Sequence, residues 1–236
     1  MIKGTLYLIP VPLGNSPLDS VLPATVRDRA RRLQHFVAEN AKSARAFLKQ
    51  LPSDTPLQQI EIHELSEHTP ARMLPELLAP LHIGIDVGLI SEAGCPAVAD
   101  PGANLVALAQ REGIRVIPMT GPSSILLALM GSGLSGQNFS FHGYLPAKED
   151  DRHKKLRELE KDSRQEKRTQ IFIETPYRNR QMLETLLKTC ADSTRICVAT
   201  DLTLDNESIL TRTPAEWRRQ GLPEIDRRPT VFLLQA

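Results

Sequence analysis

The chain has 236 residues, of which 41% are hydrophobic and 24% are charged, and its formal net charge is +1. This composition is that of a globular protein with a core of one large or two small domains. The near-neutral charge excludes a strong overall field that would attract nucleic acid or an anionic membrane surface. The N-terminal stretch MIKGTLYLIPVPLG has too short an apolar run, broken by prolines, to predict a signal peptide or a membrane span. We therefore expect a cytoplasmic protein with no membrane association.

The cysteines and histidines do not show the spacing of metal ligands. Cys95, Cys190 and Cys197 form no CxxC pair, and His63 and His68 are wrongly spaced for one helix face. An odd number of cysteines without a secretory signal is typical of free thiols in a reducing compartment. The sequence therefore predicts no metal site.

The first half of the chain alternates short β-type runs with helical stretches. Strands are expected in GTLYLIP, HFVAEN, LQQIEIHEL, DVGLIS and IRVIPM. Helices are expected over residues 19–33, with Pro23 in the first turns, and in AKSARAFLKQL, PARMLPELLAPL and ANLVALAQREG. Repeated strand–helix–strand units predict a parallel sheet with helices on both faces.

The second half ends in a different pattern. Helices are expected in SSILLALMGSG, in the highly charged KEDDRHKKLRELEKDSRQEK and in NRQMLETLLKTC, the charged one exposed and frayed at its ends. Strands are expected in NFSFHGYL, RTQIFIET and TRICVAT, followed by antiparallel strands in ESILTRT and PTVFLLQA. This change predicts two α/β domains, residues 1–117 with a parallel sheet and residues 118–236 with a mixed sheet, and a boundary near Pro118.

Three loops of the first half combine glycine or proline with small side chains. They are VPLGN after the first strand, SEAGCPAVADPG after the fourth and TGPSS after the fifth. Ligands of open α/β sheets bind beyond the carboxyl ends of the strands, and small residues let the backbone approach them closely. The three loops together therefore predict a shared pocket, although each alone is also compatible with an ordinary turn between a strand and a helix.

Other nucleotide and hydrolase motifs are absent. The sequence contains no GxxxxGK[ST] and no GxSxG, and the glycines of MGSGLSG follow a helical stretch rather than a strand. These observations argue against a phosphate-binding P-loop, a dinucleotide fold and a serine hydrolase.

An ordered set of motifs covers almost the whole chain. These are GTLYLIPVPLGN, LSEHTPARMLPELL, GLISEAGCPAVADPGANLV, VIPMTGPSSILLALMGSGL, FSFHGYLP, IFIETPYRNRQMLETL and TDLTLDNESILT. Together they resemble the tetrapyrrole methylase superfamily of S-adenosylmethionine-dependent methyltransferases, and within it most of all the branch that methylates cytidine 2′-oxygens of small-subunit ribosomal RNA. The resemblance implies two α/β domains with the S-adenosyl-L-methionine cleft between them, usually in a homodimer.

The resemblance also implies cofactor contacts, which come mostly from main chain. Leu13 matches the residue of the first loop that lies against the cofactor, and Ser123 and Ser124 match the pair that opens the first helix of the second domain. The small-residue turn corresponds to Ala93, Gly94 and Cys95, with the apolar Val98 behind it. Glu174 and Leu202 match positions that close over the adenine end. On this interpretation, larger side chains at residues 93–96 would collide with the cofactor.

One segment departs from the pattern of the RNA-methylating branch. That branch has an acidic residue, a threonine and an arginine where this chain has Asn40, Ala41 and Lys42 after Glu39, while Arg45 keeps a cation downstream. Since an alcohol that accepts a methyl group must lose its proton, a carboxylate, histidine or lysine could assist. The catalytic candidates are Glu39, Lys42, Arg45 and His68, together with Glu67.

The departure leaves the methyl acceptor open. Ribosomal RNA or the small ribosomal subunit is the acceptor that the resemblance favours. A tetrapyrrole or corrinoid ring carbon is a second acceptor, although the sequence has only 4% aromatic residues to build an apolar trough. A protein that binds the cofactor without catalysis is a third interpretation. The positive charges of residues 152–168 are interleaved with negative ones, which is more typical of a solvated helix than of an RNA site.

Overall fold

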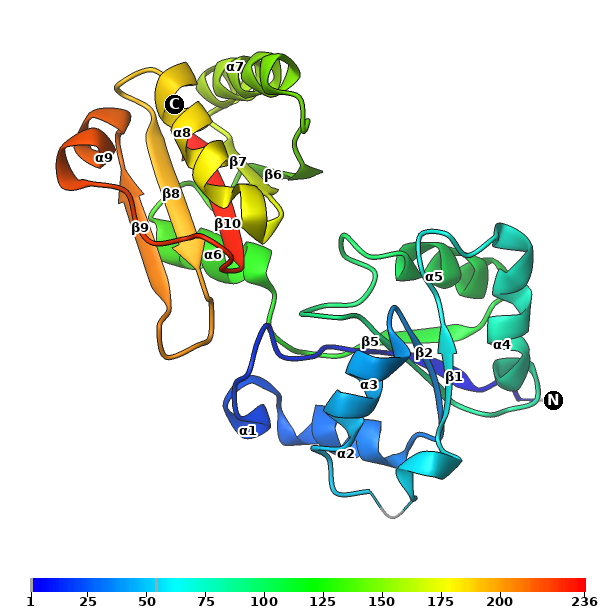
Figure 1. The fold of residues 1–236 in the computed structure, drawn as a ribbon. Helices are drawn as coiled ribbons and strands as arrows, with labels where there is room; N and C mark the ends of the chain where they lie inside the picture. The colour runs from blue at the N-terminus through cyan, green and yellow to red at the C-terminus, as the bar shows by residue number, and fades with distance from the viewer. Residues whose placement is uncertain (1, 54) are drawn as a thin grey trace. The chain divides into compact units, whose positions relative to one another are not determined.

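The computed structural model describes residues 2–53 and 55–236, which divide into two compact units between Ser123 and Ser124 (Figure 1). This division lies a few residues beyond the predicted boundary near Pro118. The segment after Pro118 stays with the first unit because it packs there: the Met119 N–H donates to the Leu8 carbonyl at 3.0 Å, and Gly121 lies directly against Pro10.

The first unit is a parallel sheet with the strand order β3-β2-β4-β1-β5. Its strands are β1 (Thr5–Ile9), β2 (His35–Ala38), β3 (Glu61–Glu64), β4 (Val87–Ile90) and β5 (Arg115–Pro118). Its α-helices are α1 (Leu18–Val21), α2 (Ala24–Arg32), α3 (Ala41–Leu48), α4 (Leu74–His82) and α5 (Gly102–Arg111), and its short 3-10 helices are η1 (Leu57–Gln59) and η2 (Ala71–Met73). The predicted parallel sheet is confirmed.

Helices cover both faces of this sheet because its strands alternate their side chains between two cores. Tyr7 and Ile9 pack with α2 and α3, whereas Leu6 packs with α4 and α5 on the other face. Burial on both sides explains why the three central strands, β1, β2 and β4, are nearly continuous apolar runs, whereas the edge strand β3 is polar and largely exposed.

The strand order creates a switch point between β1 and β4. The two strands are neighbours, with Ile9 opposite Ile90, yet the chain continues from β1 to β2 in one direction and from β4 to β5 in the other. The loops that leave these strands therefore diverge, which opens space at the carboxyl edge of the sheet.

The single helix predicted over residues 19–33 is wrong. The structure has two helices, α1 and α2, separated at Leu22 and Pro23. Leu22 is extended, with φ −121° and ψ 126°, because a proline disfavours the helical conformation of the residue before it.

The second unit has a mixed sheet with the strand order β6-β7-β10-β8-β9. Its strands are β6 (Phe139–Tyr144), β7 (Thr169–Ile173), β8 (Arg195–Thr200), β9 (Ser208–Arg212) and β10 (Thr230–Gln235). Its α-helices are α6 (Ser124–Ser132), α7 (Glu149–Glu166), α8 (Asn179–Thr189) and α9 (Pro214–Gln220), with a 3-10 helix η3 (Pro176–Arg178). β9 pairs antiparallel with β8, and β10 pairs antiparallel with both β7 and β8, which confirms the predicted late antiparallel strands.

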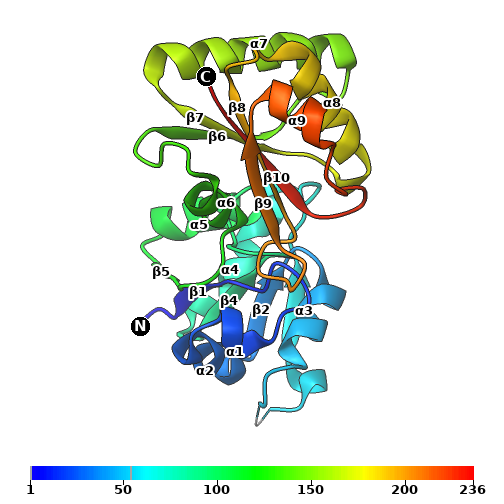
Figure 2. The ribbon, with the colours of Figure 1, turned by 90° about the vertical axis from the view of Figure 1, so that its left-hand side faces the viewer.

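The helices of the second unit cover both faces of its sheet. α7, α8 and α9 form a core with β7, β8 and β10, and α6 packs on the other face, as Figures 1 and 2 show. The charged helix α7, predicted to be exposed, buries one side, which includes Leu156, Leu159 and the charged Arg152. α9 was not predicted, although Thr213 and Glu216 form the capping box that marks its start.

The carboxyl ends of β7 and β8 lie at one edge of this second sheet. Both strands are antiparallel to β10, which begins there, so that Ile173 pairs with Val231 and Thr200 with Thr230. The residues that follow β7 and β8 therefore share this edge.

No helix among the described residues is long and apolar enough to cross a membrane.

We predict that Gly121→Ala destabilises the first unit by about 1–3 kcal/mol, because the new Cβ would lie 2.3 Å from Pro10 Cβ and force the two loops apart. Urea unfolding of the full chain measures this loss. Gly136→Ala is the matched control, since no atom lies within 4 Å of its Cβ position. Equal unfolding midpoints for the two variants would contradict the prediction.

Candidate functional site

The structure brings together the three loops that follow β1, β4 and β5. Val11 and Gly94 form an isolated antiparallel bridge, in which the Val11 N–H donates to the Gly94 carbonyl at 3.0 Å and the Gly94 N–H donates back at 3.1 Å. The Cys95 thiol donates to the Pro122 carbonyl at 3.4 Å. The first and third loops are thus both joined to the second.

The close approach of these loops favours a glycine at position 94. Its φ is +73°, and a Cβ there would lie 3.1 Å from Leu13 Cδ2 and 3.4 Å from the Pro122 oxygen. The positive φ and the close approach of the protein's own loops together favour glycine at this position, without any ligand. The predicted cofactor contacts of Gly94 and of its neighbours Ala93 and Cys95 stay predictions.

The second loop contains a strained turn. Ala97 and Ala99 adopt the left-handed conformation, with φ of 65° and 56°. Asp100 stabilises this turn because its Oδ1 accepts from the N–H groups of Ala97 at 3.1 Å and Gly102 at 2.6 Å. The turn leaves Val98 49% exposed. Because such strain is characteristic of ligand-binding and catalytic sites, the turn supports a functional role for this loop.

Glu39 lies beside the same loop. It directly follows β2, and its N–H donates to the Ile90 carbonyl at 3.4 Å. Burial raises the pKa of the Glu39 carboxyl, and the negative charges of Asp100, Glu92 and Glu67 raise it further, against a hydrogen bond from the Glu92 backbone. Burial also raises the pKa of Asp100, whose Oδ2 is buried without a hydrogen-bond partner among the described residues. Glu39 is thus a half-buried carboxyl in a negative environment.

The other catalytic candidates have exposed side chains. Lys42 lies in the first turn of α3 and Arg45 in its last turn, and no hydrogen bond or ion pair holds either side chain within residues 2–53 and 55–236. His68 lies in the turn after β3 with its side chain 88% exposed, 3.6 Å from Glu67. Of the five candidates, only Glu39 is enclosed by the loops described above.

The departure at Asn40 has a local structural explanation. Asn40 is the N-cap of α3, and its side chain accepts from the N–H groups of Lys42 at 2.9 Å and Ser43 at 3.2 Å. The N–H of Ala41 donates to Glu64 at 3.0 Å. The first turn of α3 is therefore fully capped, a role that the preference of asparagine for N-caps could have indicated from the sequence.

The candidates of the second unit lie where β7 and β8 end. Glu174, 5% exposed, accepts at Oε1 from the Arg178 guanidinium at 2.6 Å, while its Oε2 is buried and has no partner among the described residues. Leu202 is buried between two left-handed residues, Asp201 and Thr203. Ser124 begins α6, and Ser123 ends the first unit.

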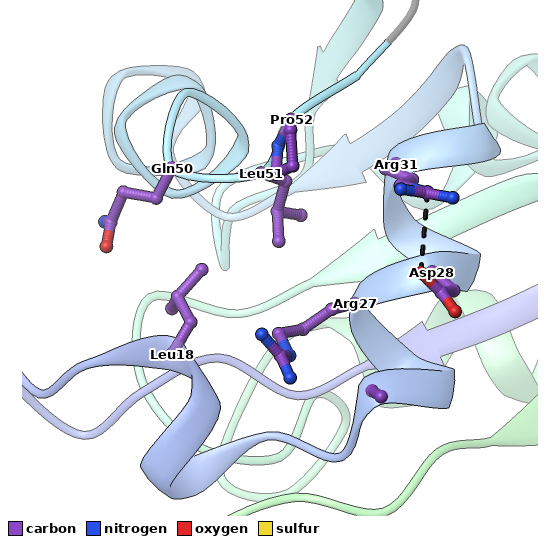
Figure 3. Close-up of a pocket in the computed structure, with 8 residues that line it drawn as sticks. Leu18, Arg27, Asp28, Arg31, Gln50, Leu51 and Pro52 are labelled. Carbon is purple, nitrogen blue, oxygen red and sulfur yellow. Dashed lines mark ion pairs between the residues drawn. The ribbon is translucent and has the colours of Figure 1, made fainter.

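A separate hollow of about 210 Å³ lies beside α2 in the first unit (Figure 3). Figure 3 shows Arg27 leaving α2 toward Leu18 and Gln50, whereas Arg31 pairs with Asp28 along the helix at 3.5 Å. The Arg27 Nε is buried and lacks an acceptor in the described part of the chain. None of the three loops lines this hollow, which is therefore distinct from the candidate site.

No group of three or more described His, Cys, Asp or Glu residues could hold a metal ion.

The sequence matches the tetrapyrrole (corrin/porphyrin) methylase family over residues 5–216. It is 34% identical over 240 residues to the ribosomal RNA small subunit methyltransferase I of Xylella fastidiosa, covering 98% of this chain and 80% of that one. The relative of Vibrio cholerae with the same name is 32% identical over 204 residues, covering 86% of this chain and 67% of that one.

The fold is similar to that of solved methyltransferases. The uroporphyrin-III C-methyltransferase of Thermus thermophilus, complexed with S-adenyl homocysteine, aligns with a TM-score of 0.59 at 15% identity, covering 98% of this chain and 97% of that one. At this level of identity the similarity establishes the two-unit α/β fold, as the resemblance of the motifs implied.

We predict that Asn40→Ala destabilises the first unit by about 1 kcal/mol, because two N–H groups of α3 lose their acceptor. Asn40→Asp should preserve stability, since aspartate caps helices equally well. Thermal unfolding of both variants measures the difference. The prediction is wrong if the alanine and aspartate variants unfold at the same temperature.

Proposed function

This chain belongs to the tetrapyrrole methylase family, and we propose that it transfers a methyl group from S-adenosyl-L-methionine to small-subunit ribosomal RNA, at the ribose 2′-oxygen of a cytidine. The observation that carries the proposal is the 34% identity, over 98% of the chain, to a relative named for methylation of this RNA. The similarity to tetrapyrrole-methylating enzymes is at 15–18% identity and supports the fold alone.

The joined loops of the first unit are proposed to bind the cofactor, which supplies an activated methyl group on a sulfonium. Leu13, Ala93, Gly94, Cys95 and Ser123 would contribute main chain and small side chains. The exposed Val98 on its strained turn would provide an apolar contact. The carboxylates of Glu39, Glu92 and Asp100 create a negative environment that attracts a cation. Contacts from Ser124, Glu174 and Leu202 of the second unit remain expectations from the resemblance.

Glu39 is proposed as the general base. The 2′-hydroxyl becomes a better nucleophile as its proton is removed, and a Glu39 carboxylate oxygen would accept that proton. The raised pKa makes this carboxylate a stronger base than an ordinary glutamate. Lys42 and Arg45, which extend from the helix that follows Glu39, are proposed to contact RNA phosphates through their exposed cationic groups. His68 would lie at the edge of the same surface, beside β3.

The proposal includes one protein partner, a second copy of the chain. The chain is expected to form a homodimer, as the family does, and sedimentation velocity measures this directly.

Two alternative functions predict different outcomes. Methylation of a corrinoid precursor in place of RNA would favour the tetrapyrrole alternative. Binding of cofactor without transfer to either acceptor would favour a protein that has lost catalysis.

Cys95 provides a test of the cofactor site. Burial raises the pKa of its thiol, so that alkylation by iodoacetamide should be slow at pH 7 and accelerate at higher pH as the thiolate forms. Saturating S-adenosylhomocysteine should then protect Cys95 from alkylation, as read by mass spectrometry. Cys190 and Cys197, buried and with pKa values raised to about 12 and 11, are internal controls that should stay unlabelled. Equal labelling of Cys95 with and without the compound would exclude the proposed location.

The decisive assay uses labelled S-adenosylmethionine and small subunits from a strain that lacks the corresponding methylation. The wild-type chain should label one cytidine, and Glu39→Gln should reduce the rate by about 10²–10⁴-fold. Lys42→Ala should instead weaken RNA binding with a smaller effect on the rate at saturating RNA. No transfer to RNA by the wild-type chain would overturn the proposed function.

Stability measurements separate the catalytic role of Glu39 from a structural one. Because the pKa of Glu39 is raised in the folded state, its charged form costs stability at pH values above that pKa, and protonation restores this stability as the pH falls. Glu39→Gln should therefore raise the unfolding temperature at pH 8, and the gain should vanish near pH 4. A less stable variant at pH 8 would indicate that the loss of activity follows from misfolding.

A further inference from the structure

We propose that the second unit carries a stacking site for a nucleobase of single-stranded RNA, which we call the Tyr177 surface. This surface is formed by Tyr177, Arg180, Gln181, Glu184, Asp226 and Arg227. The inference rests on the proposed function in taking RNA as the partner. It adds a base-binding surface that lies outside the loops of the first unit.

The Tyr177 surface lies at the edge of the sheet where β7 ends and β10 begins. Tyr177 belongs to η3, which follows β7, and Arg180 and Gln181 lie in the first turn of α8. Asp226 and Arg227 belong to the loop between α9 and β10. The N–H of Arg227 donates to the Pro176 carbonyl at 3.1 Å, which joins this loop to η3.

The backbone under the surface is held rigidly. Asn179 is fully buried, and its side-chain amide donates to the carbonyls of Ile225 at 3.1 Å and Arg228 at 2.7 Å. These bonds fix the α9–β10 loop on both sides of Arg227, which adopts a left-handed φ of 60°. The left-handed conformation is unfavourable for arginine, so the surrounding hydrogen bonds maintain it at a cost in free energy. The backbone of Arg227 is therefore held in one position beside η3.

Tyr177 is an aromatic side chain that the fold leaves unused. It is 82% exposed and is not part of the core beneath it. The Arg227 guanidinium lies over its ring, with the Cζ 5.9 Å from the ring centroid. An exposed aromatic ring beside a guanidinium is the combination on which proteins stack the bases of single-stranded RNA. Aromatic residues make up only 4% of the chain, and Tyr177 is more exposed than the other exposed aromatic side chains of the described residues, Tyr144 at 61% and Phe139 at 39%.

The neighbouring arginines have structural partners, whereas Arg227 does not. Arg178 binds the buried Glu174 at 2.6 Å, and Arg228 binds Asp201 at 2.7 Å. The Arg227 side chain forms no ion pair with any described residue, and its one recorded interaction there is with the Tyr177 ring. Its charge is therefore available to a phosphate or to the face of a base.

The hollow beside Tyr177 suits the edge of a base. It is an open hollow of about 480 Å³ at the surface, which leaves room for a base beside the ring. Arg180 pairs with Glu184 at 3.4 Å, while Asp226 is exposed and has no partner among the described residues. A carboxylate accepts a hydrogen bond from an exocyclic amine, so the surface should prefer cytosine or adenine over uracil.

The test measures binding of fluorescein-labelled oligocytidine to the full chain by fluorescence anisotropy. Tyr177→Ala should weaken binding by about 5- to 150-fold, the range expected for the loss of one stacked base. Tyr177→Phe keeps the aromatic ring and should bind with the affinity of the wild-type chain. Arg227→Ala should also weaken binding. Arg157→Ala, which removes an exposed cation from α7, is the charge-matched control and should have little effect. Asp226→Ala should reduce the preference for oligocytidine over oligouridine.

Several outcomes would overturn the proposal. These are wild-type affinity in Tyr177→Ala, equal losses in Tyr177→Phe and Tyr177→Ala, or an equal loss of affinity for duplex RNA, whose base faces are not accessible. Circular dichroism and the urea unfolding midpoint show whether each variant is folded, and neither depends on cofactor binding. Methylation by the wild-type chain tests the proposed function separately: activity with no effect of Tyr177→Ala removes only this inference, whereas stacking without any methylation removes only the proposed function.

Discussion

The bridge between Val11 and Gly94 is the constraint on which the candidate site depends. Two backbone hydrogen bonds join the loops after β1 and β4, the two strands at the switch point of the sheet. The bridge favours a glycine because the φ of Gly94 is positive and an added Cβ would lie only 3.1 Å from Leu13 Cδ2. Once the loop after β4 is held there, its strained turn and Asp100 take positions beside Glu39, which comes from a third strand.

The two units use carboxylates in different ways. In the first unit, Glu39 and Asp100 form no ion pair among the described residues, and burial raises the pKa of both; neighbouring carboxylates raise the pKa of Glu39 further. In the second unit, Glu174 and Asp201 are neutralised by Arg178 and Arg228. The first arrangement maintains an energetically costly charge, which is typical of a functional site, whereas the second stabilises the ends of strands.

The structure also changes the interpretation of Asn40 and Ala41. From the sequence, these residues weaken the case for catalysis because they replace an acidic residue and a threonine of the RNA-methylating branch. In the structure, Asn40 caps α3 and leaves Glu39 in position beside the loop after β4. The departure therefore alters the surface at the start of α3 without disturbing the carboxylate that precedes it.

Local pattern was sufficient to predict most of the strands and helices, the parallel and mixed sheets, and the three loops at the carboxyl edge. Alternation of apolar residues and turn-forming residues is a short-range property, and so it can be read along the chain. The errors were local as well: the proline at residue 23 divides a helix, and the capping box at Thr213 starts one that was overlooked.

Only the tertiary structure decided which residues are neighbours. The order β3-β2-β4-β1-β5 places Glu39 beside Asp100, and a buried asparagine places Arg227 beside Tyr177. The raised pKa of Glu39 and the proximity of Arg227 to the Tyr177 ring follow from these distant contacts. Periodicity does not encode these contacts, because they arise from the packing of segments far apart in the chain. The sequence was therefore sufficient to predict which loops form the candidate site, but not the electrostatics of that site.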